Sequence, residues 1–94
     1  MLFRSDTRDE HQVAAGIIHF AVLATLAEVS AARAVGAAVV PSTVTLHLLS
    51  PAKPGRLVAK GRVLRKGKRL ATAEGEVTQD GALVAKATVT FALL

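Results

Sequence analysis

The sequence contains no cysteine, tryptophan or tyrosine, and three phenylalanines are its only aromatic residues. A chain without cysteine has no disulfide framework, no thiolate metal site and no cysteine nucleophile. Because aromatic residues make up only 3% of the chain, its apolar 51% consists mainly of alanine, valine and leucine. We therefore expect a thin core of small side chains and, at 94 residues, a single domain that gains stability from a second copy of itself.

The chain also lacks an uninterrupted apolar run of the ~20 residues that a membrane-spanning helix needs. Its N-terminus shows no basic start followed by an apolar stretch, so we predict no signal peptide, no membrane contact and a cytoplasmic location. The three histidines, His11, His19 and His47, do not have the spacing of metal ligands. We accordingly predict neither a metal site nor a cofactor.

Acidic residues are missing from residues 53–69, a stretch that holds eight of the twelve basic residues. Such a basic cluster attracts an anion, which could be a nucleic acid, an anionic surface or a phosphorylated small molecule. A solvated strand face is the plain structural alternative. No aromatic residue lies in the cluster to stack on bases, so we predict a small-molecule partner and no nucleic acid.

A long central helix is predicted over residues 13–36, after a polar lead-in at residues 1–12. Alanine and leucine dominate the range, Gly36 is a typical stop, and the start falls near Ile17 or Ile18. Because apolar residues occupy nearly every side of this helix, we expect it to be buried on nearly every side.

Residues 37–94 alternate between polar and apolar side chains, which predicts antiparallel strands. The expected strands are 43–49, 56–65, 69–79 and 82–94, separated by turns rich in glycine and proline.

Three-residue loops at 66–68 and 80–82 would keep the charged side chains of these strands on one face of the sheet. They would place Lys60 opposite Glu74 and Glu76 opposite Lys86. The other face would carry mainly alanine, glycine and valine, which let a helix approach closely. The sequence therefore predicts an α+β fold in which an antiparallel sheet wraps one long central helix.

Glu28 is the only acid between Glu10 and Glu74, and it lies inside the predicted helix. A buried carboxylate is costly unless it is paired, neutralised or used. Pairing with Arg33 is poor, because five residues along a helix separate two side chains by about 140°. Glu28 is therefore a candidate catalytic carboxylate, and an exposed helix edge is the alternative.

His19 lies nine residues before Glu28, which puts the two about 180° apart and about 13.5 Å along a helix. A site containing both would need two chains with their helices side by side, whereas a structural histidine at the helix start is the alternative. The helix N-terminus near Phe20 exposes unpaired N–H groups, which suit a carbonyl oxygen that becomes negative.

Gly16, His19 and Glu28, with the apolar residues between them, resemble the signature of the hotdog-fold acyl-CoA thioesterases of the phenylacetate-pathway type. That family shows Asn-x-x-Gly-x-x-His-Gly-Gly and then an acid nine residues after the histidine. Gly16 matches the first glycine, His19 the histidine and Glu28 the acid, while Phe20 stands at the glycine after the histidine. The resemblance covers residues 10–94 and implies a hotdog fold.

The resemblance also implies hydrolysis of an acyl-CoA thioester at the interface of a homodimer, or of a homotetramer built from such dimers. Glu28 would act as nucleophile or general base, and His19 and the backbone N–H of Phe20 would belong to the catalytic site on the other subunit. Val13 stands at the asparagine of the family, with Gln12 beside it as the substitute, and Gly16 and Ser30 would contact the substrate. Helix packing is the alternative for Ser30.

The phosphates of coenzyme A would lie against basic residues of the strands: Arg62, Arg65, Lys66, Lys68 and Arg69. A hotdog protein that binds an acyl group or CoA without catalysis is the alternative function.

Overall fold

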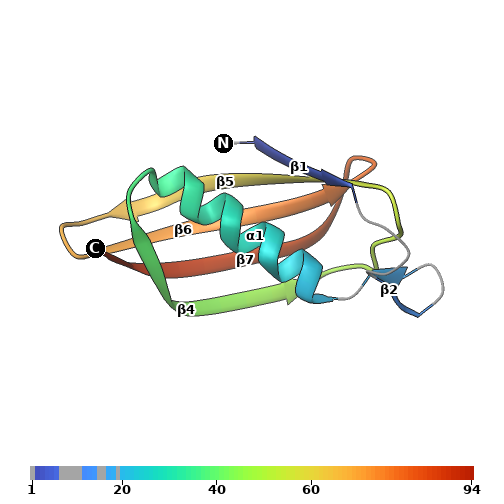
Figure 1. Ribbon diagram of the computed structural model, residues 1–94, viewed down its shortest axis with the longest axis horizontal. Coiled ribbons are helices and arrows are strands. Elements are labelled where there is room, and N and C mark those ends of the chain that lie inside the picture. The colour runs from blue at the N-terminus through green and yellow to red at the C-terminus, as the bar shows by residue number, and fades with distance from the viewer. Residues whose placement is uncertain (1, 7–11, 15–16, 19) are drawn as a thin grey trace.

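Five strands form one antiparallel sheet in the order β1-β5-β6-β7-β4, and a long helix lies against one of its faces (Figure 1). The computed structural model describes residues 2–6, 12–14, 17–18 and 20–94. In chain order the elements are β1 (Leu2–Asp6), β2 (Gln12–Ala14), β3 (Ile17–Ile18), α1 (Phe20–Val35), β4 (Val39–Leu48), β5 (Arg56–Lys66), β6 (Leu70–Gln79) and β7 (Ala82–Leu93). The predicted wrapping of a central helix by an antiparallel sheet is confirmed.

The helix begins later than the sequence predicts. Residues 12–14 and 17–18 form the two short strands β2 and β3, which pair with each other. The β-branched side chains of Val13, Ile17 and Ile18 favour extended backbone, which explains the difference. The predicted end is confirmed, because α1 stops at Val35 and Gly36 has a φ of 71°.

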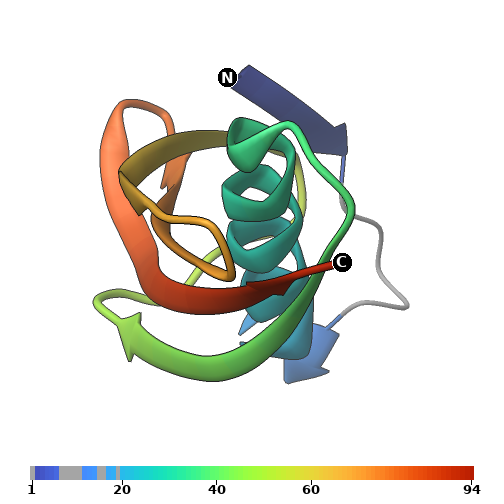
Figure 2. The same cartoon turned by 90° about the vertical axis from the view of Figure 1, so that its left-hand side faces the viewer.

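The sheet curls around part of the helix and leaves one side of it uncovered (Figure 2). The helix residues that face the sheet are buried: Leu23, Leu26, Ala27, Ser30, Ala31 and Val35. Phe20, Ala21, Thr25 and Arg33 are exposed. The predicted burial on nearly every side is therefore wrong for a single chain. Among the described residues, no helix has the length and apolar character needed to cross a membrane.

Two glycines let the helix approach the sheet. A Cβ atom at Gly61 would overlap the carbonyl oxygen of Ser30, and one at Gly75 would overlap that of Ala27. The two glycines are paired across β5 and β6, and Ala87 of β7 continues the row. Because the residues at these positions are small, the backbone of α1 can lie directly against the backbone of the sheet.

Both predicted loops are one residue too long. Gly67 N donates to Leu70 O at 2.8 Å, and Asp80 and Gly81 have φ values of 51° and 80°. These features define two-residue turns, the second of type I′. Two-residue turns alone would shift the strand register by one residue and mix the two faces.

A β-bulge in each hairpin returns the charged side chains to one face of the sheet and the small apolar ones to the other. Leu64 is the extra residue on β5, and Val84 is the extra residue on β7. The bulges leave Glu76 opposite Lys86, as predicted, but Lys60 opposite Glu76 rather than Glu74. The predicted pair of Lys60 with Glu74 is therefore wrong, and Arg62 faces Glu74 instead.

Candidate functional site

Glu28 lies at the flank of the buried face of α1. It follows the fully buried Ala27 by one residue, so its side chain is turned about 100° away from the sheet. The residue is half-buried. Among the described residues, no hydrogen bond or ion pair engages its carboxylate, and Arg33 does not pair with it. The carboxylate is therefore shielded in part from water and is unpaired.

The N-terminus of α1 is a second polar feature. The helix begins at Phe20, whose side chain is 54% exposed. No acidic residue occupies the first turn, so the N–H groups of this turn and the positive end of the helix dipole have no helix carboxylate beside them. The positive end of the helix dipole therefore favours an oxygen atom that carries negative charge.

Glu28 cannot reach the N-terminus of its own helix. It comes eight residues after Phe20, which is a rise of about 12 Å. A glutamate side chain is much shorter than this distance. The carboxylate and the helix N-terminus can therefore act on one bond only if they come from different copies of the chain.

The side chains of three predicted site residues are not among those that the structure describes. Gly16 and His19 lie outside the described residues. Gln12 contributes backbone to β2, where it pairs with Ile18, but its side chain also lies outside the description. Their proposed roles stay predictions.

Ser30 has a packing position. It is fully buried between α1 and the sheet, and its hydroxyl donates to the carbonyl oxygen of Ala27 at 3.0 Å. The side chain faces Gly75 across the contact. This position does not suit the substrate contact predicted from the sequence, and it agrees with the alternative of a helix-packing hydroxyl.

A hollow of about 330 Å³ lies on the first turns of α1 and is lined by Ala21, Val22, Thr25 and Leu26. Its one polar side chain is already engaged, because Thr25 Oγ1 donates to Ala21 O at 2.8 Å. The surface next to the helix N-terminus is therefore apolar in character.

The predicted basic residues divide into two groups. Arg62 forms an ion pair of 2.7 Å with Glu74, which Lys86 also contacts at 3.3 Å. Lys66 donates to the carbonyl oxygen of Val35 at 3.2 Å, where it satisfies the end of the helix. These two residues already hold structural partners.

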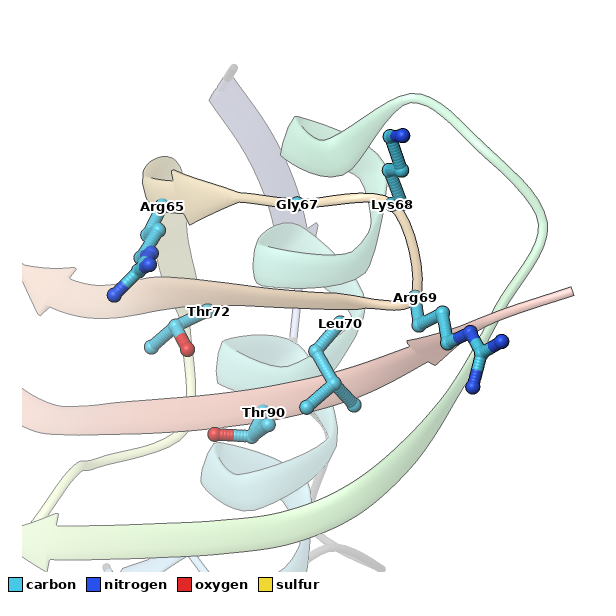
Figure 3. A pocket seen from close by; sticks show the side chains of 7 residues that line it. All are labelled: Arg65, Gly67, Lys68, Arg69, Leu70, Thr72 and Thr90. Atoms are coloured by element: carbon cyan, nitrogen blue, oxygen red, sulfur yellow. The ribbon is translucent and has the colours of Figure 1, made fainter.

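Arg65, Lys68 and Arg69 line a hollow of about 460 Å³ at the turn between β5 and β6 (Figure 3). Two lining residues, Thr72 and Thr90, are absent from the sequence-based prediction. Alternation along β6 and β7 marks both as facing away from the helix, but only the register brings them to Arg65.

The strand β4 has an open edge. Leu49 N donates to Val84 O, and Leu94 N donates to Ala38 O. Hydrogen-bonding direction alternates along an antiparallel strand, so in the part of β4 that follows the register shift between Pro41 and Thr43 the N–H and C=O groups of three residues point away from β7: Val44, Leu46 and Leu48. Val44 and Leu48 are also 47% and 51% exposed. An apolar edge of this length is a surface on which another strand can pair.

The described residues contain no group of three or more histidines or acids that could hold a metal ion. The family model of the acyl-CoA thioesterase N-terminal domain matches residues 7–92. A comparison with curated proteins finds no match.

Several solved structures superpose closely on the chain. A thioesterase-type phenylacetic acid degradation-related protein from Ralstonia eutropha shares 28% identity at a TM-score of 0.92, over 98% of this chain and 74% of that one. A point mutant of the phenylacetic acid degradation protein PaaI from Thermus thermophilus shares 26% identity at 0.90, over 99% and 84%. A protein from Bacillus halodurans, solved with CoA, shares 25% at 0.90, over 99% and 66%.

Proposed function

The chain belongs to the acyl-CoA thioesterase N-terminal domain family and is a hotdog-fold thioesterase that hydrolyses acyl-CoA thioesters, and we propose that two copies of it build each active site. Glu28 comes from one copy and the N-terminus of α1 from the other. The observation that carries this proposal is the half-buried, unpaired Glu28 carboxylate, about 12 Å from the start of its own helix.

The open edge of β4 supports the assembly of two copies. Antiparallel pairing of β4 with the same strand of a second copy, centred on Leu46, would engage all three outward-pointing residues. Val44 of each copy would then face Leu48 of the other, which covers both exposed apolar side chains. Pairings centred elsewhere on β4 engage fewer of these residues, so Leu46 is the best centre.

The chemistry follows from the two polar features. The thioester carbonyl oxygen would accept a hydrogen bond from the N–H of Phe20, where the helix dipole favours the negative charge that develops. The acyl group would lie in the apolar hollow beside Ala21, Val22, Thr25 and Leu26. The Glu28 carboxylate of the other copy would approach the carbonyl carbon from the side.

The reaction balances with water as the only co-reactant. As general base, Glu28 takes a proton from water while the water oxygen attacks the carbonyl carbon. The C–S bond then breaks, and the proton passes to the departing thiolate, which leaves as CoA. As nucleophile, Glu28 instead forms a mixed anhydride, which water hydrolyses to the same acid and thiol.

Thiol release from short, medium, long and aromatic acyl-CoAs tests the proposal. Glu28→Gln is expected to lower kcat by about 10²–10⁴, because the amide neither accepts a proton nor attacks. Glu76→Gln is the matched control, since it removes a carboxylate from the other face of the sheet. Equal turnover by wild type and Glu28→Gln would remove Glu28 from the mechanism, and turnover of no acyl-CoA would favour acyl binding without catalysis.

A further inference from the structure

Phe20 combines a large apolar side chain with an exposed position at the start of α1. Leu23 and Ala27 follow it by three and seven residues, a spacing that puts all three on one face of the helix. Leu23 and Ala27 are buried against the sheet, whereas Phe20 is 54% exposed. The sheet therefore covers this face further along α1 but leaves more than half of its first residue accessible to a ligand.

The side chain of Phe20 and the apolar hollow on α1 lie on opposite sides of the helix axis. At about 100° per residue, the four residues that line the hollow are turned by about 100–240° from Phe20. The centre of the hollow thus points about 170° away from the Phe20 side chain. A ligand that enters the hollow and crosses the end of the helix therefore meets Phe20 on the far side.

The N–H groups of the first turn lie between these two apolar surfaces. Each Cα–Cβ bond of an α-helix tilts toward the N-terminus, and the unpaired N–H groups of the first turn point the same way. The ring of Phe20 consequently leans past the end of the helix. A carbonyl oxygen bound there, about 2.9 Å from its donor nitrogen, would have the ring on one side and the hollow on the other.

A thioester bound at this end has two arms. The oxygen, the acyl carbon and the sulfur leave the carbonyl carbon in three different directions in one plane. If the oxygen faces the helix end and the acyl chain enters the hollow, the sulfur must point away from the hollow. This is the side on which Phe20 lies.

We propose that the ring of Phe20 binds the thiol arm of the substrate, at the sulfur and the methylene groups next to it. The assignment rests on the proposed function for the position of the carbonyl group. A sulfur atom against an aromatic ring is a favourable contact, and methylene groups remove exposed ring surface from water. The Phe20 side chain thus determines specificity for the thiol, while the hollow determines specificity for the acyl group.

Hydrolysis of acyl-CoAs of increasing chain length tests this division. Phe20→Ala is expected to lower kcat/KM about fivefold to tenfold, by the same factor for every acyl group, because the ring does not touch the acyl chain. Val22→Ala, in the hollow, should have an effect that grows with chain length. Replacing CoA by pantetheine in the substrate should leave the Phe20→Ala factor unchanged, since the contact lies at the sulfur.

Two variants serve as controls. Phe20→Leu keeps most of the apolar surface and loses the contact between ring and sulfur, so its kcat/KM should fall about twofold to threefold; it also replaces Phe20→Ala if thermal unfolding shows that the alanine variant does not fold. Leu64→Ala removes an apolar side chain of similar exposure, 47%, from β5. It should change kcat/KM by less than about twofold.

Two kinetic results would overturn the proposal. A Phe20→Ala loss that increases with acyl chain length would show that the ring lines the path of the acyl group instead. A kcat/KM equal to that of wild type for every acyl group would show that the ring makes no contact with the substrate that matters for the reaction.

Calorimetric titration with CoA separates this inference from the proposed function. In the Glu28→Gln background, where turnover plays no part, adding Phe20→Ala should weaken CoA binding about fivefold. If Glu28→Gln hydrolyses acyl-CoA as fast as wild type, the proposed mechanism fails, yet CoA binding that depends on Phe20 still supports the thiol contact. If Glu28→Gln is inactive and Phe20→Ala leaves CoA binding unchanged, the function stands and the thiol contact is refuted, as it also is if CoA does not bind.

Discussion

The contact between Gly75 and the helix makes the sharpest prediction about stability. In Gly75→Ala the new methyl group would overlap the carbonyl oxygen of Ala27 and lie 2.7 Å from Oγ of Ser30. The side chain of Ser30 could rotate, but the Ala27 carbonyl is fixed in the helix and cannot. The whole helix would have to move away from the sheet.

Overpacking of this kind costs about 1–3 kcal/mol, and a clash with backbone places Gly75→Ala near the upper end. For a domain of this size, ~3 kcal/mol lowers Tm by about 12–24 °C. Urea and thermal unfolding measure the loss. Gly36→Ala is the comparison, because its φ of 71° makes it strained while nothing lies within 4 Å of the new methyl; it should cost only about 1 kcal/mol.

A second substitution identifies the atom responsible. If the Ala27 carbonyl causes the loss, adding Ser30→Ala to Gly75→Ala does not restore stability. Recovery in the double variant would refute the backbone clash, and so would a Gly75→Ala protein that is within about 0.5 kcal/mol of wild type.

Two further predictions concern the edge strand and a turn. Leu46→Cys introduces the only cysteine of the chain, and pairing of β4 centred on this residue would put the two Cα atoms about 5.5 Å apart, within reach of a disulfide. We therefore expect a disulfide-linked dimer on a non-reducing gel after mild oxidation, whereas Thr43→Cys should remain monomeric on the gel; the reverse result would contradict the proposed centre. Gly81→Ala, at a φ of 80° in open space, should lower stability by about 1 kcal/mol in urea unfolding, and an unchanged midpoint would argue against the type I′ turn.

Much of the candidate site could be predicted from residue spacing. The separation of His19 and Glu28 by nine residues already requires two chains, and the isolated acid in an apolar helix marks Glu28. The spacing could not show where each side chain points or whether it already has an interaction partner. Ser30 is close to Glu28 in sequence, but a turn of about 200° directs it into the sheet, and Arg62 and Lys66 have partners that are distant in sequence.

The sequence by itself determined the central helix and the four strands that follow it, where the helix ends, and which small residues face it. These properties depend on neighbours along the chain: alternation sets the two faces of each strand, and Gly36 supplies the backbone freedom that ends the helix. They can be inferred without knowing which strands pair.

Only the tertiary structure decided the bulges and the register. A two-residue turn and a bulge together give the same alternation of faces as a three-residue loop, so the pattern cannot distinguish them. The choice depends on how the strands fit around α1 at Gly61 and Gly75. The same choice sets Arg65 against Thr72 and Thr90 on the outer face of the sheet, because only one register of these distant strands brings the three residues together.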